Sequence, residues 1–275
     1  MSRLFLLLIL VLGGLLAGAR ALQSARQPEA GSESVVAAAT TPATATPVTV
    51  PGPVVTGLPP SPTATPYLDQ MVRLEAIRRL GVEARYTYLD SLLATSDSVV
   101  RRWADRRGHP IRVAVTEPPD GSPGAVLRAL VGAALSAWDR PEANVRMALA
   151  ADTVAADIVI EWIDHFVSRP VAGGGTQDVQ QTGLTGLTAN GRGEIQRARI
   201  HLALTDGRGR RLADDEIQAV AIHELGHALG LPHSGDPADI MFPTVQARTL
   251  SARDRASQVL LYRLPPGSIR QPPSQ

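Results

Sequence analysis

The sequence contains no cysteine and no lysine, and aromatic residues make up only 4% of its 275 positions. Without cysteine, the chain can form no disulfide, no thiolate metal site and no cysteine nucleophile. All 27 basic residues are arginines, which we attribute to a compositional bias because no single site requires it. The formal net charge of +1 gives no basic excess of the kind that indicates a nucleic-acid partner.

Long apolar runs are also scarce, and the clearest one lies at the N-terminus. It covers residues 4–17, and the small residues Ala19 and Ala21 follow it. This order is typical of a cleaved secretory signal over residues 1–21, although the same segment could remain as a membrane anchor. The run is short for a bilayer-spanning helix, which needs roughly 20 apolar residues. Either interpretation places the rest of the chain outside the cytoplasm, secreted or tethered to the outer face of the membrane.

Two segments separate this run from the main domain. Residues 22–66 consist largely of Thr, Pro, Ala, Ser and Val, which predicts an extended, disordered linker. Residues 67–102 begin with apolar residues at helical spacing, and Gly81 is expected to end this helix. A second helix is predicted over residues 86–93. We interpret 67–102 as a helical accessory segment, which could alternatively be a pro-segment.

Residues 103–264 carry the pattern of an α+β domain. Short alternating or β-branched runs predict strands, and longer runs with helical spacing predict helices. Asn190–Gly193 predicts a hairpin turn, and Ser251 with Asp254 predicts the start of the last helix. A Pro-rich tail over 265–275 follows. The expected strands are 111–115, 144–149, 156–162, 182–188 and 195–204, the expected helices are 123–138, 214–229 and 251–261, and 171–178 is an expected Gly-rich loop.

The segment from His223 to His233 carries the strongest chemical signal in the chain. His223 and His227 are four residues apart in a predicted helix, so their imidazoles lie on one face, one turn apart. Two imidazoles at this spacing can bind one metal ion. Glu224 follows His223 directly, which places its carboxylate beside the metal and not on it.

The residues after this helix predict a third ligand. Gly230 can adopt the left-handed conformation that ends a helix, and Pro232 prevents the helix from resuming. The chain can therefore turn and bring His233 to the same ion. Three neutral histidines leave one tetrahedral position of Zn²⁺ open for water, as in catalytic zinc sites. Glu224 would take a proton from this zinc-bound water as general base and pass it to the leaving amine as general acid, which is metal-assisted hydrolysis of an amide bond.

The fixed positions from His223 to His233 resemble the metzincin signature, and Ser234 directly after them is similar to the matrixin branch. Met241 resembles the methionine of the Met-turn, which lies beneath the metal, and residues 156–160 resemble the strand that precedes the active site. The resemblance implies an exported zinc metalloendopeptidase. It also implies a twisted, mostly parallel sheet with an edge strand, a long zinc-binding helix, and a small C-terminal subdomain that ends in a helix.

The resemblance further implies where a substrate binds. An extended peptide would pair along an edge strand, for which residues 182–188 are the candidate, and Pro243 would line the pocket just after the scissile bond. We therefore expect a protein or peptide substrate, and a monomer that meets a membrane only through an uncleaved N-terminal segment. The tentative substrate-pocket residues are Thr182, Gly183, Leu184, Thr185 and Pro243.

The chain departs from the animal matrixins in two respects. It has no cysteine, so it cannot use their pro-peptide cysteine to block the zinc. Residues 171–188 contain no histidine, whereas those proteins bind a second, structural zinc near this position. We therefore expect one catalytic zinc and interpret His165 and His201 as surface or hydrogen-bonded residues. Calcium could bind loop oxygens, but no loop has an EF-hand pattern.

Two other functions stay open on the sequence alone. The Thr- and Pro-rich linker is consistent with a surface-tethered binding protein that has a protease-like fold and no turnover. The intact Glu224 argues against that interpretation. A zinc hydrolase of small amides is the other alternative, and the third histidine at metzincin spacing weighs against it.

Overall fold

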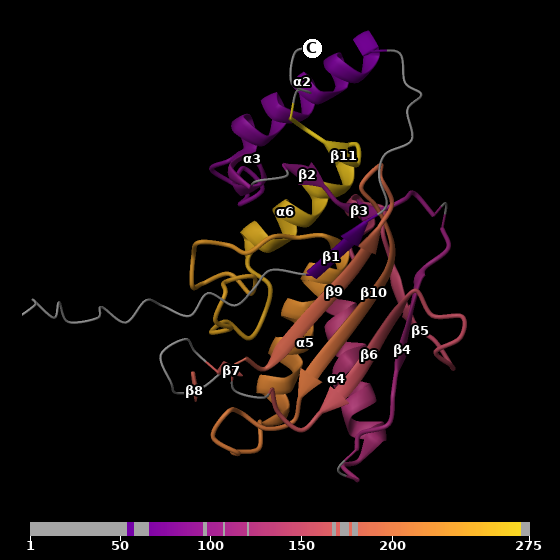
Figure 1. The fold of residues 1–275 in the computed structure, drawn as a ribbon, viewed down its shortest axis with the longest axis vertical. Helices are drawn as coiled ribbons and strands as arrows, with labels where there is room; N and C mark the ends of the chain where they lie inside the picture. The colour runs from indigo at the N-terminus through magenta and orange to yellow at the C-terminus, as the bar shows by residue number, and fades with distance from the viewer. Residues whose placement is uncertain are drawn as a thin grey trace, which may run out of the picture. The chain divides into compact units, whose positions relative to one another are not determined.

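The N-terminal apolar run, most of the linker and the last five residues lie outside the part of the chain that the structure describes. Among the described residues, no helix is long and apolar enough to cross a membrane. Figure 1 shows a sheet with helices behind it and a helical segment at one end. The computed structural model describes residues 54–57, 66–95, 98–106, 108–119, 121–166, 169–170, 176–177 and 181–270.

Within the described residues, the central sheet has seven strands and confirms the predicted mixed, mostly parallel architecture. Its order is β1-β9-β10-β6-β4-β5, and β3 also pairs with β10. Neighbouring strands are parallel except β9 and β10, which are antiparallel. The strands are β1 (Val54–Gly57), β3 (Arg102–Trp103), β4 (Ile111–Val115), β5 (Met147–Leu149), β6 (Ile158–Ile163), β9 (Gly183–Ala189) and β10 (Glu194–Ala203).

Two helices cover one face of this sheet (Figure 1). They are α4 (Gly124–Ala137) and α5 (Asp214–Leu229), which pack on each other and on the strands. The residues of β6 alternate between buried and partly exposed, as expected for a strand with one covered face. Burial of the apolar face against the helices is the main stabilising contribution. Both helices begin and end within a residue of their predicted bounds.

The predicted hairpin between β9 and β10 is confirmed. The side-chain oxygen of Asn190 accepts hydrogen bonds from the backbone N–H groups of Arg192 and Glu194, both at 3.0 Å. Gly193 has a φ of +78°, a conformation that glycine adopts without steric cost. The turn therefore fixes how β9 aligns on β10. Both strands of this hairpin pack against α5.

The helices that precede the α+β domain differ from the prediction. The first, α2 (Pro66–Glu83), continues through Gly81, because one glycine destabilises a helix by only about 1 kcal/mol. The second, α3 (Ser91–Ala94), is shorter than predicted and follows a turn at residues 84–86. The prediction of a helix over 86–93 was therefore wrong in its first half.

The predicted strand 144–149 begins late. Residues Pro141–Ala143 form a short 3₁₀ helix, η1, and Asn144 closes it with a φ of +52°. This left-handed residue cannot belong to a strand, Val145 forms only an isolated bridge with Arg140, and the strand starts at Met147. The sequence pattern predicted a strand from Asn144, but asparagine adopts the left-handed conformation more readily than most residues do.

The last helix, α6 (Ala252–Arg263), begins as predicted. The Ser251 hydroxyl accepts the Asp254 N–H at 3.0 Å, and the Asp254 carboxylate accepts the Ser251 N–H at 2.8 Å. Two short strand pairs were not predicted. One of these strands lies within the expected loop 171–178, and the other residues of that loop lie outside the described residues. These strands are β2 (Val99–Val100) with β11 (Gly267–Ser268), and β7 (Arg169–Pro170) with β8 (Thr176–Gln177).

The start of β6 is held by Asp157, whose carboxylate accepts two hydrogen bonds from Arg106, at 2.7 and 2.8 Å, and one from the Arg112 N–H. Burial raises the pKa of this carboxyl, but these donors outweigh it and lower the pKa to about 2. Because that value lies below the unfolded pKa of about 3.9, the contribution to stability is complete above pH 4. It is lost as the pH falls from 4 towards 2.

Replacing Asp157 with asparagine is therefore expected to lower the free energy of unfolding by about 2 kcal/mol at pH 7. The variant keeps the volume of the side chain and removes its charge. Denaturant unfolding at a series of pH values measures the difference between the two proteins. The difference should shrink steadily below pH 4, and a pH-independent difference would contradict the assignment.

Candidate active site

Helix α5 begins and ends where its sequence requires. The Glu216 carboxylate accepts the N–H of Ala213 at 2.9 Å, and acidic residues in the first turn suit the positive end of the helix dipole. At the other end, Gly230 has a φ of +103°, and a Cβ there would overlap the carbonyl oxygen of Arg101. Only glycine fits this position, so the chain turns here and carries His233 back towards the helix.

Three histidine side chains converge at this turn. His223, His227 and His233 each present one ring nitrogen, and these atoms lie within 4.8 Å of one another. His223 and His227 are 1% and 2% exposed. The Nδ1 atom of His223 lies 2.7 Å from the Ile240 carbonyl, and that of His227 lies 2.8 Å from the Leu231 carbonyl. Carbonyls accept only, so Nδ1 carries the proton and Nε2 presents a lone pair in both rings.

The environment of these nitrogens fits a metal ion. The buried Nε2 of His223 has no hydrogen-bond partner among the described residues, and the Nε2 atoms of His227 and His233 are 3.1 Å apart. Burial lowers the pKa of His223 and His233 to about 4 and the pKa of His227 well below its usual value. All three rings are therefore neutral at pH 7. Neutral imidazole is the form that binds zinc.

Glu224 lies beside the histidine cluster, in contact with β9. Its side chain is 3% exposed, and its carboxylate accepts a hydrogen bond from the Thr185 hydroxyl at 2.6 Å. Burial raises the pKa of Glu224 to about 7, although the Thr185 bond acts in the opposite direction. A carboxyl whose pKa lies near 7 can both take and return a proton at neutral pH. Sequence reasoning proposed Thr185 only as a substrate contact and missed this role.

Gly183 leaves the space that Glu224 occupies. A Cβ at this position would lie 2.6 Å from the Glu224 Cγ and would overlap the carboxylate. We therefore expect Gly183→Ala to displace Glu224 and to lower kcat by about tenfold to a hundredfold. Zinc content should not change, because the three atoms nearest to an added Cβ all belong to Glu224 and not to a histidine. Parallel measurements of kcat and bound zinc test the prediction, and a variant with normal kcat would contradict it.

Met241 lies against α5 at Gly226, the position of this helix that has no side chain. A Cβ on Gly226 would lie 2.9 Å from Cζ2 of Trp138 and 3.1 Å from Cε of Met241. Both of these side chains are fully buried, and the Trp138 indole donates to the Ile222 carbonyl at 2.8 Å. Gly226 therefore allows the apolar side chains of Trp138 and Met241 to pack against the helix at van der Waals distance. The role of Met241 as the Met-turn methionine beneath a metal stays a prediction.

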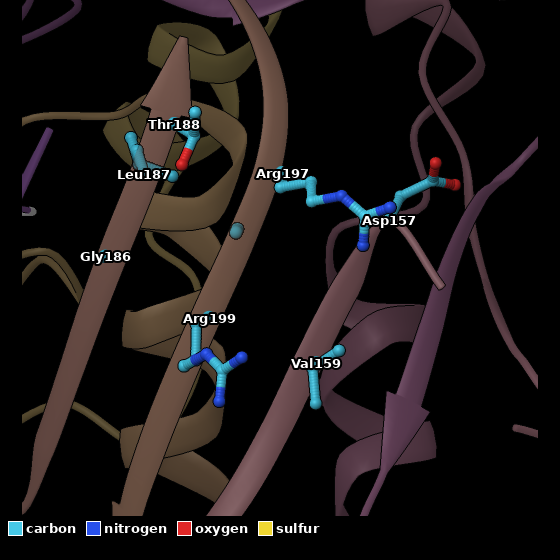
Figure 2. A pocket seen from close by; sticks show the side chains of 8 residues that line it. Asp157, Val159, Gly186, Leu187, Thr188, Arg197 and Arg199 are labelled. Atoms are coloured by element: carbon cyan, nitrogen blue, oxygen red, sulfur yellow. The ribbon is translucent and has the colours of Figure 1, made fainter. Parts of the chain in front are cut away.

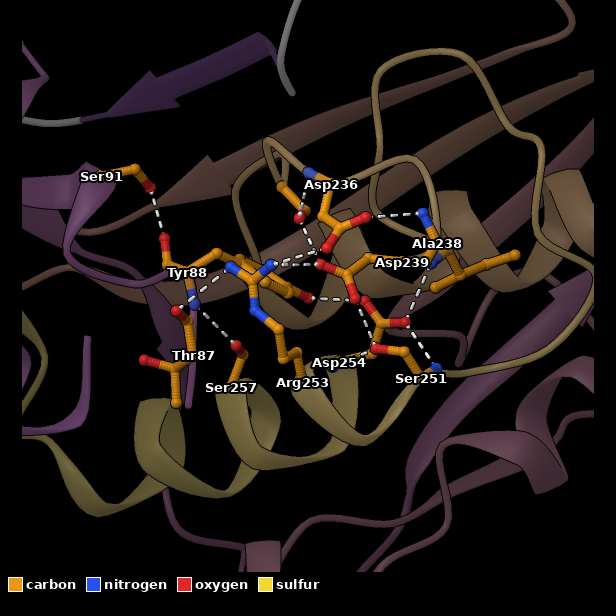
Figure 3. A network of polar contacts seen from close by, with 12 residues as sticks. Thr87, Tyr88, Ser91, Asp236, Ala238, Asp239, Ser251, Arg253, Asp254 and Ser257 are labelled. Carbon is orange, nitrogen blue, oxygen red and sulfur yellow. Dashed lines mark hydrogen bonds and ion pairs between the residues drawn. The ribbon is translucent and has the colours of Figure 1, made fainter. Parts of the chain in front are cut away.

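The loop after His233 is fixed by buried carboxylates. The Ser234 hydroxyl donates to Asp239, which also accepts from the Ser251 hydroxyl at 2.6 Å. The Ile240 N–H donates to Asp254 at 2.9 Å, and the Ile240 carbonyl accepts from His223. These contacts hold the His223 ring in one orientation, as groups behind the ligands do in metal sites. Figure 3 shows the carboxylates gathered between this loop and α6.

The structure brings only part of the tentative substrate pocket to the site. Gly183 and Thr185 contact Glu224, whereas the Thr182 carbonyl accepts from Ala203 and Leu184 pairs across the sheet with His201. Pro243 is half-buried just after the Met-turn, and its role in a pocket stays a prediction.

A separate depression lies on the open face of the sheet. Figure 2 shows Arg197 and Arg199 on β10 beside Val159 of β6, with α5 behind the sheet. No histidine lines this depression, so it is not the metal site. On the same face, His201 lies 3.0 Å from Glu161. His165 is exposed and lies 2.9 Å from Asp164.

Three neutral histidines around one point could hold one metal ion, and the buried Glu224 carboxyl follows the first of them, an arrangement that fits a hydrolytic metal site. A sequence model of the matrixin family matches residues 103–263. This match covers more than half of the chain, and the chain belongs to the matrixin family.

Individual matrixins are similar to the chain over shorter stretches. Matrilysin of Felis catus is 46% identical over 66 residues, which is 24% of this chain and 21% of that protein. Macrophage metalloelastase of Oryctolagus cuniculus is 80% identical over 25 residues, 9% of this chain and 5% of that protein. Metalloendoproteinase 1-MMP of Arabidopsis thaliana is 34% identical over 77 residues, 26% of this chain and 21% of that protein. Each match spans about a fifth or less of the relative's length.

Proposed function

We propose that this protein is an exported zinc endopeptidase in which His223, His227 and His233 bind one Zn²⁺ and Glu224 moves the proton. The observation that carries the proposal is the convergence of three neutral ring nitrogens within 4.8 Å, next to a buried carboxyl whose pKa is raised to about 7. Membership of the matrixin family supports the same function. The signal-like run over residues 4–17 supports export.

Each residue has a defined task in this mechanism. The three histidines hold the ion, and the backbone carbonyls of Ile240 and Leu231 keep two of the rings in the metal-binding tautomer. When bound, zinc supplies Lewis-acid chemistry, which polarises a carbonyl and makes water more acidic. Glu224 accepts the proton of the attacking water and delivers it to the leaving amine, while Thr185 holds its carboxylate in place.

The substrate would add to the edge of β9 that faces away from β10. Gly183 and Thr185, the residues of β9 that contact Glu224, pair with β10 on their other edge. An extended peptide along this edge would therefore pass the metal site. However, residues Gly186–Ala189 already pair on that edge with β1, four residues of the linker. A long substrate and β1 would compete for the same backbone groups.

Replacing Val54 and Val55 with proline is expected to remove this competition. Proline lacks the N–H that a strand donates, so the pairing of β1 with β9 should be lost. We expect kcat/KM for long peptides to rise about fivefold to tenfold, since a backbone hydrogen bond contributes about 1 kcal/mol. Peptides too short to reach Gly186 serve as the control and should be cleaved at an unchanged rate. An unchanged rate for both lengths would show that β1 does not limit access.

Cleavage in ¹⁸O-labelled water tests the proposed function against its rivals. The full chain, with zinc, is incubated with an unfolded protein, and the fragments are analysed by mass spectrometry. The proposal predicts internal cleavage and one ¹⁸O atom in each new carboxyl group. A tethered binding protein would capture the substrate without fragments. A hydrolase of small amides would cleave acyl-amides and leave the protein intact, and either result would reject the proposal.

A further inference from the structure

The helical segment before the catalytic domain makes buried contacts with α6. Tyr88, in the turn between α2 and α3, is 3% exposed. Its backbone N–H donates to the Ser257 hydroxyl at 3.2 Å, and its own hydroxyl donates to Asp254 at 3.1 Å. Figure 3 shows Tyr88 reaching across to α6 between Ser257 and Arg253. The guanidinium of Arg253 lies 5.9 Å from the centre of the tyrosine ring.

Tyr88 acts as a donor in this contact. Burial, followed by the nearby charge of Asp254, raises the pKa of the Tyr88 hydroxyl well above its usual value. The phenol therefore keeps its proton at every pH at which the protein functions. An ionised Asp254 can only accept, so the direction of the hydrogen bond is fixed.

Asp254 needs each of the donors that surround it. The carboxylate is fully buried, and the donors around it are the N–H groups of Ile240 and Ser251, at 2.9 and 2.8 Å, and the Tyr88 hydroxyl. The neighbouring Arg253 instead forms ion pairs with Asp236 and Asp239. A buried charge without a direct counter-ion depends on its hydrogen bonds. Loss of the hydroxyl would leave one oxygen of Asp254 without a donor and allow the carboxylate to move.

Ile240 connects this carboxylate to the metal site. Its N–H donates to Asp254, and its carbonyl accepts the Nδ1 proton of His223 at 2.7 Å. A movement of the Asp254 carboxylate would therefore shift Ile240, and Ile240 would in turn shift the imidazole of His223. The path from Tyr88 to His223 consists of three hydrogen bonds, each between buried groups.

We propose that Tyr88 is a positioning residue for the metal-binding ring of His223, acting through Asp254 and Ile240. The segment that carries it is then a built-in part of the active site and not a removable pro-segment. The packing of this segment agrees, because Leu80 and Leu89 are fully buried in the same core as α5. The inference rests on the proposed function only in taking His223 as a metal ligand.

The test is Tyr88→Phe in the full chain, which removes one oxygen and keeps the ring. We expect the dissociation constant for zinc to rise about threefold to tenfold, less than for a group in direct contact with a ligand. We also expect kcat to fall by a similar factor with KM unchanged. Substitution with Co²⁺ gives a spectroscopic readout, because its visible absorption bands should shift when the geometry of His223 changes.

Tyr262→Phe is the matched control. The Tyr262 hydroxyl also makes a hydrogen bond from α6, a partly buried one to the Leu229 carbonyl at 3.0 Å, and this carbonyl accepts from no histidine in the described residues. A comparable loss of thermal stability is expected in both variants, whereas the cobalt spectrum and the zinc affinity should change only in Tyr88→Phe. Equal effects of the two variants on metal binding would overturn the proposal.

The route can be tested separately with Asp254→Asn, alone and combined with Tyr88→Phe. If Tyr88 acts through Asp254, its effect on zinc affinity should largely disappear in the Asp254→Asn background. Additive effects would overturn this route. Different results would reject the proposed function and the role of Tyr88. A wild-type protein that binds no metal would reject the proposed function, whereas a zinc-loaded, active wild type with an unaltered Tyr88→Phe variant would reject only the role of Tyr88.

Discussion

Glu224→Ala is expected to lower kcat/KM for peptide cleavage by about 10²–10⁴-fold, the usual contribution of a general acid–base group. The carboxyl is 3% exposed, and Glu224 directly follows His223, the first of the three histidines. Zinc should stay bound at one ion per chain, because Glu224 is not one of the ligand atoms. Rates with a quenched peptide and metal analysis of the same sample test both parts.

A control variant separates this effect from a general loss of charge. Glu142 is an exposed glutamate in η1, away from the metal site, and Glu142→Ala should keep full activity and full zinc content. A Glu224→Ala protein that cleaves peptides at the wild-type rate would show that another group moves the proton. A variant that has lost its zinc would show that Glu224 is a ligand.

His233→Ala is expected to reduce zinc affinity by more than about a hundredfold, which exceeds the usual effect of an outer-shell substitution. Activity should fall in proportion to the zinc that is lost. His233 follows the turn at Gly230 and lies outside α5, so the helix and its packing should survive the change. Titration with zinc against a competing chelator measures the affinity, and circular dichroism checks the fold.

His165→Ala provides the matched control, because this histidine is exposed and pairs only with the neighbouring Asp164 among the described residues. Its zinc affinity and stoichiometry should equal those of the wild type. Normal zinc binding by His233→Ala would remove His233 from the ligand set. A lower zinc stoichiometry in His165→Ala would reveal a second metal site, contrary to the expectation of a single zinc.

The centre of the active site could be predicted because its signals are local. The i, i+4 spacing places two histidines on one face of any helix, and Gly230 with Pro232 marks where the helix ends. The bounds of α5 therefore follow from the residues themselves, as does the return of His233. The hairpin is equally local, since Asn190 and Gly193 encode their own turn.

Other features depend on contacts between distant segments, which no local pattern reveals. The hydroxyl of Tyr88 meets Asp254, 166 positions later in the chain, and Thr185 meets Glu224, 39 positions later. Asp254 was predicted as part of a capping box. That prediction gave no indication that its carboxylate also accepts the N–H of Ile240. Similarly, the Thr- and Pro-rich composition around β1 predicts an extended chain but contains nothing to specify its pairing with β9.

The most direct test of the account is a zinc titration of the full chain after the metal has been removed with a chelator. Peptide cleavage and bound zinc are measured after each addition. We predict that the metal-depleted protein does not cleave and that activity rises linearly until one zinc is bound per chain, then stops rising. A folded protein that binds no zinc, or that cleaves equally well before zinc is restored, would contradict the assignment of His223, His227 and His233 as a catalytic zinc site.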